Sequence, residues 1–276
     1  HTWLALQQAG FAVVGVDDFS NSSPEVLNRL RRLSGQEPVF VRASVCDPAA
    51  MEAVFQQHSI GATVHFAAFK AVGESTALPL NYYQNNLGGL VNVCQTMVRH
   101  AVKRFVFSSS ATVYAATEPL PWTETTRLGA TNPYGQTKQM GEQVLRDLGV
   151  SDAAWQTACL RYFNPVGAHE SGHIGEDPRG TPNNLMPYVA QVAVGRRAAL
   201  QVFGNDYPTP DGTGVRDYIH VCDLAEAHAA ALDHLARGGH AATYNVGTGR
   251  GFSVLEVIAA AERITGTAVP HRFSPR

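Results

Sequence analysis

The sequence predicts an α/β fold, in which a doubly wound parallel sheet is followed by a smaller mixed α/β part. Up to about residue 164, strand-like apolar runs alternate with helical patterns, as in β-α-β units with right-handed crossovers. The first run, 11–16, is continuously apolar, which is typical of a strand buried on both faces of a parallel sheet. Beyond that point, loops rich in Gly, Pro and Asn separate the elements. We therefore expect two parts, 1–164 and 165–276.

The elements follow in order from capping signals and periodicity. A short helix at 1–9 ends at Gly10, a C-cap signal. After the strand at 11–16 comes a turn-rich stretch and a helix with a basic face of Arg29, Arg31 and Arg32. The other expected strands are 39–42, 62–67, 104–108, 157–161, 200–203, 243–246 and 269–272, and the other expected helices are 48–57, 87–100, 133–148, 185–194, 222–236 and 254–265.

Composition excludes several classes of protein. The 276 residues are 45% hydrophobic and 16% charged, with a net charge of −2, so we expect neither nucleic-acid nor membrane binding. No apolar run approaches the roughly 18 residues of a membrane span, and no signal peptide is visible. The cysteines are widely spaced, which favours free buried thiols in the cytoplasm; they are Cys46, Cys94, Cys159 and Cys222.

Tyr134 and Lys138 are four residues apart in the predicted helix 133–148, so they share one helical face. A free tyrosine titrates near ~10, too high for a base at neutral pH. A nearby ammonium favours the phenolate and lowers that pKa, so the pair can take a proton from a hydroxyl group. The alternative is a solvated surface helix, and composition alone gives such a pair by chance roughly one time in ten.

Asp17 closes the first predicted strand. In a doubly wound dinucleotide-binding (Rossmann-type) fold, an acid at the end of the second strand binds the adenosine ribose, which favours NAD over NADP. A turn-forming role in Asp17-Asp18 is an equally good interpretation. The strand 104–108 ends in hydroxyls, Ser108 to Ser110, at the sheet edge where ligands of parallel sheets bind.

Six stretches together carry a specific resemblance. They are HFAAFKAVGES (65–75), FSSSATVY (107–114), NPYGQTK (132–138), LRYFNPVGAH (160–169), PNNLMPY (182–188) and DGTGVRDYIHV (211–221). In them the chain resembles the extended short-chain dehydrogenase/reductase superfamily and, within it, the UDP-glucose 4-epimerase family. The stretches span nearly the whole chain.

The resemblance implies reversible 4-epimerisation of UDP-glucose and UDP-galactose through a transient 4-keto sugar, with a tightly held NAD that is not consumed. It makes Tyr134 the base, Lys138 the ligand of the nicotinamide ribose, and Ser110 the group that orients the 4-hydroxyl. It implies an NAD-binding part at 1–164, a predominantly UDP-sugar-binding part at 165–276, and a homodimer. No metal is implied.

The implied binding residues fall into two sets. The NAD set is Asp17, Asp18, Asn21, Ser22, Ser44, Val45, Phe66, Ala67, Ala68, Lys70, Asn85, Ser110, Tyr134, Lys138 and Phe163. The UDP-sugar set is Lys70, Ser110, Thr112, Tyr134, Asn164, Asn184, Leu185, Phe203, Arg216 and Tyr218. Arg216 also suits a diphosphate on physical grounds, because a guanidinium donates paired charged hydrogen bonds. Relatives usually carry an acid at Ser44-Val45.

Two rival functions remain open. A nucleotide-sugar 4,6-dehydratase needs an added acid and base just after the strand-end hydroxyl, where this chain has Ala111 and Thr112. A nucleotide-binding protein without activity is the other rival. Relatives begin with a strand and a glycine-rich loop that would precede His1, and they extend beyond Arg276. We therefore expect a fragment of a longer protein that is unstable or inactive as it stands.

Two short sequence patterns resemble functional motifs, but we do not interpret them as functional sites. His169-Glu170-Ser171-Gly172-His173 fits the zinc-protease pattern, but the surrounding glycines and prolines make the required continuous helix improbable. The glycine cluster 247–251 lies too late in the chain for the first phosphate-binding turn, so we interpret it as a turn of the second part.

Overall fold

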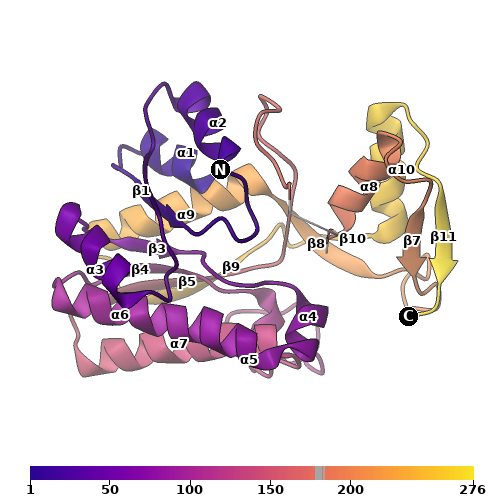
Figure 1. Ribbon diagram of the computed structural model, residues 1–276. Coiled ribbons are helices and arrows are strands. Elements are labelled where there is room, and N and C mark those ends of the chain that lie inside the picture. The colour runs from indigo at the N-terminus through magenta and orange to yellow at the C-terminus, as the bar shows by residue number, and fades with distance from the viewer. Residues whose placement is uncertain (178–181, 183) are drawn as a thin grey trace. The chain divides into compact units, whose positions relative to one another are not determined.

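The computed structural model describes residues 1–177, 182 and 184–276. The chain divides into two compact units (Figure 1): the first contains His1–Phe163 and Cys222–Val246, and the second Asn164–Val221 and Gly247–Arg276. The first boundary lies one residue before the expected division at 164, between Phe163 and Asn164. Residues 222–246, expected in the second part, belong instead to the first unit, because their strand pairs with its sheet.

The first unit is built on parallel strands. The strands β3 (Thr63–His65), β4 (Arg104–Ser108), β5 (Gln156–Tyr162) and β9 (Ala242–Val246) form one sheet in that order. The strands β1 (Val14–Asp17) and β2 (Val39–Arg42) pair with each other, also in parallel. The expected strand bounds 39–42 and 104–108 are confirmed, whereas the expected strands 11–16 and 62–67 are shorter in the structure.

Helices cover both faces of this sheet, as a doubly wound fold requires (Figure 1). On one face lie α3 (Pro48–Gln57), α6 (Gly89–Arg99) and α7 (Pro133–Ser151), which pack against Phe105 and Phe107 of β4. On the other lie α1 (Thr2–Gln8) and α9 (Val221–Ala236), which pack against Val106 between them. The side chains of successive β4 residues therefore pack into two hydrophobic cores on opposite faces of the sheet.

Local signals explain the helix limits. Asp47 caps α3 by accepting hydrogen bonds from Ala49 and Ala50, and Pro48 opens the helix. The helix α2 (Glu25–Ser34) ends at Gly35, whose φ of 69° is left-handed. The expected helix 87–100 starts earlier, through a π-helical stretch, η1 (Tyr83–Gly88), and the sequence did not reveal the two short helices before it, α4 (Val72–Ala77) and α5 (Pro79–Tyr82).

Among its described residues, the second unit holds short strands and two helices. In one sheet β8 (Val215–His220) lies between β6 (Asn164–Val166), its parallel partner, and β10 (Gly251–Ser253), its antiparallel partner. In the other, β7 (Leu200–Phe203) pairs in parallel with β11 (His271–Ser274). The helices α8 (Leu185–Ala193) and α10 (Val254–Thr265) pack on a core that includes Val189, Val202 and Ile258.

The structure bears on the expectations about the cysteines and about membrane-spanning helices. No disulfide joins the four cysteines; Cys94 and Cys159 are buried, but Cys46 is exposed, so the expectation of burial is wrong there. Within the described residues, we find no helix with the length and apolar character that a membrane crossing demands.

Candidate functional site

The three expected catalytic residues meet where β4 ends and α7 begins. Asn132 caps α7 by accepting a hydrogen bond from the Gly135 amide at 2.9 Å, and Pro133 opens the helix. Lys138 Nζ donates to the Ser108 carbonyl oxygen at 2.6 Å and lies 5.9 Å from the centre of the Tyr134 ring. The side chain of Ser110 hydrogen-bonds to Tyr134.

Burial dominates the electrostatics of this group. Burial raises the pKa of Tyr134, and the hydrogen bond with Ser110 offsets only part of that rise. Burial also lowers the pKa of Lys138 to about 7. The sequence predicts a tyrosine pKa lowered by the lysine, and the structure shows the opposite net direction. An ammonium that is 3% exposed and partly deprotonated at neutral pH is a weaker source of positive potential than spacing alone suggests.

A buried ion pair, which the sequence did not predict, lies one turn of α7 after Lys138. Glu142 is completely buried and binds Arg161 of β5 through two hydrogen bonds, of 2.8 and 2.6 Å. Glu142 also accepts a hydrogen bond from Ser109 at 2.6 Å. Burial alone would lower the pKa of Arg161, but its hydrogen bonds to Glu142 and Tyr114 raise it. The available signal was helical spacing, because Glu142 is four residues after Lys138.

The end of β1 holds the acid that the sequence analysis expects at the ribose. Asp17 ends the strand and accepts hydrogen bonds from the Phe19 amide at 2.7 Å and from the Ser22 hydroxyl at 3.0 Å. Both bonds end on the same carboxylate oxygen, Oδ1. Asp18 accepts from the Ser20 amide, so each acid shapes the turn, as the turn-forming interpretation predicts. Asn21 lies in the same turn.

The next residues of the expected NAD set lie just after the ends of β2 and β3. Ser44 and Val45 follow β2; the Ser44 hydroxyl accepts from the Cys46 amide, and the Val45 carbonyl accepts from Asn92 at 2.7 Å. After β3 come Phe66, Ala67, Ala68 and Lys70. Phe66 is 42% exposed, with its ring 4.6 Å from that of His228.

The chain after β3 is fixed to α7. Asn86 accepts from the Phe69 amide at 2.7 Å and donates to Thr137 at 3.1 Å, while its neighbour Asn85 donates to the Asn86 side chain. Phe163 follows β5 and packs beside Val113. The expected NAD residues of the first unit thus follow the carboxyl ends of β1 to β5, except for Asn85 in η1 and Tyr134 and Lys138 in α7.

The expected UDP-sugar residues divide between the units. Thr112 is in the first, where its hydroxyl donates to Ser110 at 3.0 Å. In the second, Asn164 and Tyr218 are register partners on β6 and β8, and Asn164 donates to the Asp217 carbonyl oxygen. Arg216 is exposed on β8.

The other expected residues of the second unit lie at element ends. Asn184 occupies the N-cap position of α8 without a side-chain capping bond and donates to Glu176 at 2.7 Å, with Leu185 as the next residue. Phe203 is 61% exposed at the end of β7. Asn183, which is part of the resembling stretch 182–188, lies outside the described residues.

The two declined patterns have local structural roles. Residues 169–173 form turns, in which the ring nitrogen Nδ1 of His169 bonds to the Ser171 hydroxyl at 2.8 Å. In the glycine cluster, Thr248 and Gly249 donate their backbone amides to the Asp217 carboxylate at 2.9 and 2.8 Å. That cluster belongs to the second unit, as the sequence predicts.

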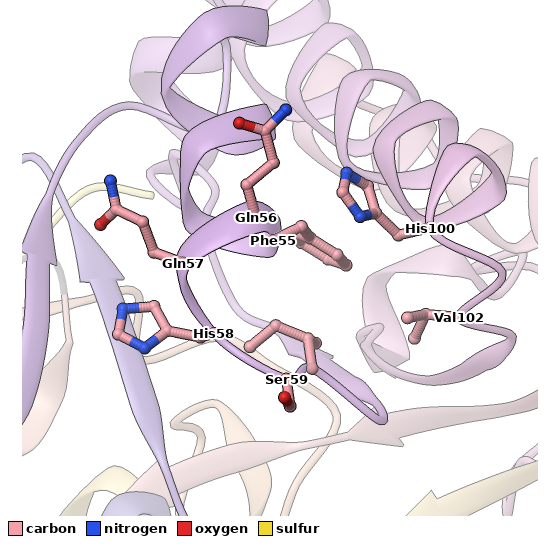
Figure 2. A pocket seen from close by; sticks show the side chains of 8 residues that line it. Phe55, Gln56, Gln57, His58, Ser59, His100 and Val102 are labelled. Carbon is pink, nitrogen blue, oxygen red and sulfur yellow. The ribbon is translucent and has the colours of Figure 1, made fainter.

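A separate cavity of about 240 Å³ lies at the far end of the strands (Figure 2). It follows the last turn of α3, before β3 begins, and the Phe55 and His100 rings within it are 5.5 Å apart. Its lining is Phe55, Gln56, Gln57, His58, Ser59, Ile60, His100 and Val102. None of these is an expected site residue, so the cavity is distinct from the catalytic group.

Comparisons with known proteins agree with this geometry. Residues 1–247 match the NAD dependent epimerase/dehydratase family. The chain is 56% identical over 276 residues to the UDP-glucose 4-epimerase of Bacillus subtilis, with all of this chain and 81% of that protein covered. It is 50% identical over 283 residues to the UDP-glucose 4-epimerase of Homo sapiens, again covering all of this chain and 81% of that protein.

Solved structures show the same fold. The UDP-glucose-4-epimerase of Stenotrophomonas maltophila, with bound NAD and formylated UDP-arabinopyranose, has a TM-score of 0.97 and 51% identity, covering all of this chain and 82% of that one. The UDP-glucose 4-epimerase of Bifidobacterium longum, in complex with NAD+ and UDP, has a TM-score of 0.95 and 50% identity over the same shares. The predicted doubly wound α/β fold is therefore confirmed.

Proposed function

We propose that this chain, which belongs to the NAD dependent epimerase/dehydratase family, interconverts UDP-glucose and UDP-galactose by 4-epimerisation through a transient 4-keto sugar. The observation that carries the proposal is the group formed by Tyr134, Lys138 and Ser110 at the end of β4. A phenol hydrogen-bonded to a hydroxyl, with an ammonium 5.9 Å from the phenol ring, suits the removal and return of a proton at one sugar hydroxyl. The relatives named above carry the same activity in their names.

The residues of the first unit fit NAD. Asp17 keeps the second oxygen of its carboxylate available beyond the two bonds that both end on Oδ1, which suits a ribose hydroxyl donor. The exposed face of Phe66 suits a flat ring. We assign the whole NAD set of the sequence analysis to this role. When bound, NAD supplies the hydride acceptor and donor for C4 of the sugar.

The protein's own groups move the proton. Tyr134 takes the proton of the sugar 4-hydroxyl and later returns it to the oxygen of the 4-keto sugar. Ser110 holds that oxygen and stabilises the phenolate through its hydrogen bond with Tyr134. Lys138 binds the nicotinamide ribose and adds positive potential when it is protonated.

Residues of the second unit bind the uridine diphosphate. Arg216 is the diphosphate ligand, because its exposed guanidinium donates in pairs to phosphate oxygens. Asn164, Asn184, Leu185, Phe203 and Tyr218 complete the nucleotide site, and Lys70 and Thr112 contact the sugar part. This division gives the first unit the cofactor and the second predominantly the substrate. We further propose a homodimer in the cytoplasm.

The dehydratase alternative is not favoured. Elimination of water needs an acid and a base beside the tyrosine, and the positions after Ser110 hold Ala111, which is 9% exposed, and Thr112. Neither side chain exchanges protons at neutral pH.

The test supplies UDP-galactose to the purified full-length protein, saturated with NAD and freed of excess cofactor. We expect UDP-glucose to form without net production of NADH, because the cofactor is restored in every turnover. A 4-keto-6-deoxy sugar as product would instead establish a dehydratase. Absence of both products in a folded, NAD-bound protein would contradict the proposal.

A further inference from the structure

Three consecutive residues at the end of β4 contact three successive turns of α7. The Ser108 carbonyl accepts from Lys138 at 2.6 Å, and the Ser110 side chain hydrogen-bonds to Tyr134. Between them, Ser109 Oγ donates to Glu142 Oε1 at 2.6 Å. Tyr134, Lys138 and Glu142 are spaced four residues apart, so they form one line along the helix. The strand end and the helix therefore meet in three ordered contacts, two of which involve expected catalytic residues.

The contact between Ser109 and Glu142 is fully buried and is reinforced by an ion pair. Both side chains are completely buried, and Arg161, which is 4% exposed, holds both oxygens of the carboxylate. Arg161 belongs to β5, the strand next to β4, so the carboxylate is tied to the sheet at two strands. A buried carboxylate that leaves this arrangement loses several charged hydrogen bonds at once, which makes sliding of α7 along β4 costly.

We propose that Glu142 and Ser109 are positioning residues, which fix α7 on the end of β4 and thereby hold Tyr134 against Ser110. The inference rests on the proposed function, in which Tyr134 is the base. The partners of the Glu142 carboxylate are Ser109, Arg161 and Arg146, and they include neither Tyr134 nor Lys138. Glu142 acts through the helix, one turn beyond Lys138 and two beyond Tyr134.

Loss of the Ser109 contact has a defined consequence. A helix that shifts or turns weakens the hydrogen bond between Ser110 and Tyr134, which is the interaction that lowers the pKa of Tyr134. The other titratable groups coupled to Tyr134 are Tyr82 of α5 and Tyr162 of β5, and Lys138 lies beside it on α7. Their own contacts do not include Ser109, so they stay constant while this contact is removed.

The experiment replaces Ser109→Ala, which removes the contact at the strand and leaves the ion pair of Glu142 and Arg161 intact. We expect kcat to fall about 10-fold to 100-fold with KM unchanged, because misplacement of a catalytic group by a fraction of its contact distance has effects of that size. We also expect the phenolate absorbance of Tyr134 to appear at higher pH. The absorbance of the Tyr134 phenolate is obtained by subtracting the pH titration curve of the matching Tyr134→Phe variant from that of each protein.

The matched control is Arg146→Gln. Arg146 is exposed and reaches the same carboxylate at 3.5 Å, but it belongs to α7 itself and makes no contact with the strand. We expect this variant to keep the kcat and the Tyr134 titration of the parent protein. A change as large as that of Ser109→Ala would show that the charge of Glu142, rather than its contact with the strand end, matters, and would overturn the proposal.

A second variant covers the case in which Ser109→Ala does not fold. Glu142→Leu combined with Arg161→Met removes the contact without leaving a buried charge unpaired, an exchange that proteins often tolerate. We expect the same fall in kcat and the same rise in the pH of phenolate formation. A folded variant of either kind with an unchanged Tyr134 titration would overturn the proposal. The titration needs no substrate, so it remains decisive even if the proposed epimerase activity is absent.

Discussion

At the scale of single residues, burial decides the charge states of the site. Lys138 packs 5.1 Å from the centre of the Phe107 ring and 5.9 Å from that of Tyr134, with its ammonium bound to one carbonyl oxygen. One hydrogen bond with a neutral oxygen does not replace full hydration, so the ammonium is destabilised. The spacing of Tyr134 and Lys138 was readable from the sequence, but this desolvation was not.

The phenol of Tyr134 can be tested directly. We expect Tyr134→Phe to lower kcat about 10²-fold to 10⁴-fold, because it removes the proton acceptor and keeps the ring. The measurement is the rate of conversion of UDP-galactose to UDP-glucose. The matched control is Tyr244→Phe, which removes a hydroxyl from a tyrosine that is 39% exposed on β9. A Tyr134→Phe variant with the activity of the parent would refute the assignment of the base.

The pKa of Lys138 predicts how stability depends on pH. The pKa is about 7 in the folded protein against an ordinary 10.5, so between these values the unfolded chain binds the extra proton and stability rises with pH. Relative to Lys138→Met, the free energy of unfolding should rise by on the order of 4 kcal/mol across that window, at about 1.4 kcal/mol per pH unit. Urea unfolding of both proteins at pH 7 and pH 10 measures the difference. Parallel pH profiles would show that Lys138 is not destabilised by burial.

At the scale of elements, short polar strands are the features that sequence patterns missed. β8 contains Arg216, Asp217 and His220, and β6 and β10 have three residues each, so neither an apolar run nor a clear alternation marks them. Their hydrogen bonds come from partners that are distant in sequence, such as Asn164 with Tyr218. Elements with a clear apolar pattern were predictable, and the bounds 48–57, 200–203 and 254–265 are confirmed.

The start of α10 gives a prediction for one element. Ser253 accepts from the Glu256 amide at 3.0 Å and Glu256 accepts from the Ser253 amide at 2.8 Å, while Ser253 also donates to Asp211. Ser253→Ala should therefore destabilise α10 by about 1–2 kcal/mol. Hydrogen exchange of the α10 amides is the measurement. The control is Ser151→Ala, an exposed serine at the end of α7, for which no change in α10 is expected; equal exchange in both variants would contradict the cap's role.

At the scale of the whole molecule, the first unit gathers chain segments far apart in sequence. β9, after residue 240, pairs with β5, and α9 supplies Ala225, Ala229 and Leu232 to the same core as Ala5 and Leu6 of α1. A simple cut of the chain at residue 164 does not describe this arrangement. The reason is physical: a strand joins the sheet whose edge it can pair with, whatever its position in the sequence.

Two buried histidines make the first unit sensitive to acid. Burial lowers the pKa of His65 to about 3 and that of His228 to about 4, from an ordinary 6.5. Below pH 6.5 the unfolded chain therefore binds protons that the folded one does not, and stability falls as the pH drops toward 4. We expect a loss on the order of 3 kcal/mol for each histidine over that range.

His228→Leu separates the two contributions. Nδ1 of His228 donates to the Leu224 carbonyl oxygen at 2.8 Å, while Nε2 is buried without a hydrogen-bond partner. Leucine removes that unsatisfied atom, so the variant should be as stable as the parent at pH 7 and lose less stability on acidification. Urea unfolding at pH 7 and pH 5 measures both. The same acid sensitivity in the variant as in the parent would show that His228 is not held neutral.

The sequence by itself determined most of the helices, the strands with an apolar pattern, the turn at Asp17 and the helical spacing of Tyr134 and Lys138, because these depend on neighbours within a few residues. The tertiary structure alone decided that β9 joins the first sheet, that Lys138 is dehydrated, and that Glu142 is held between Ser109 and Arg161. Burial and charge pairing depend on which distant segments pack together, and a local pattern contains no record of that.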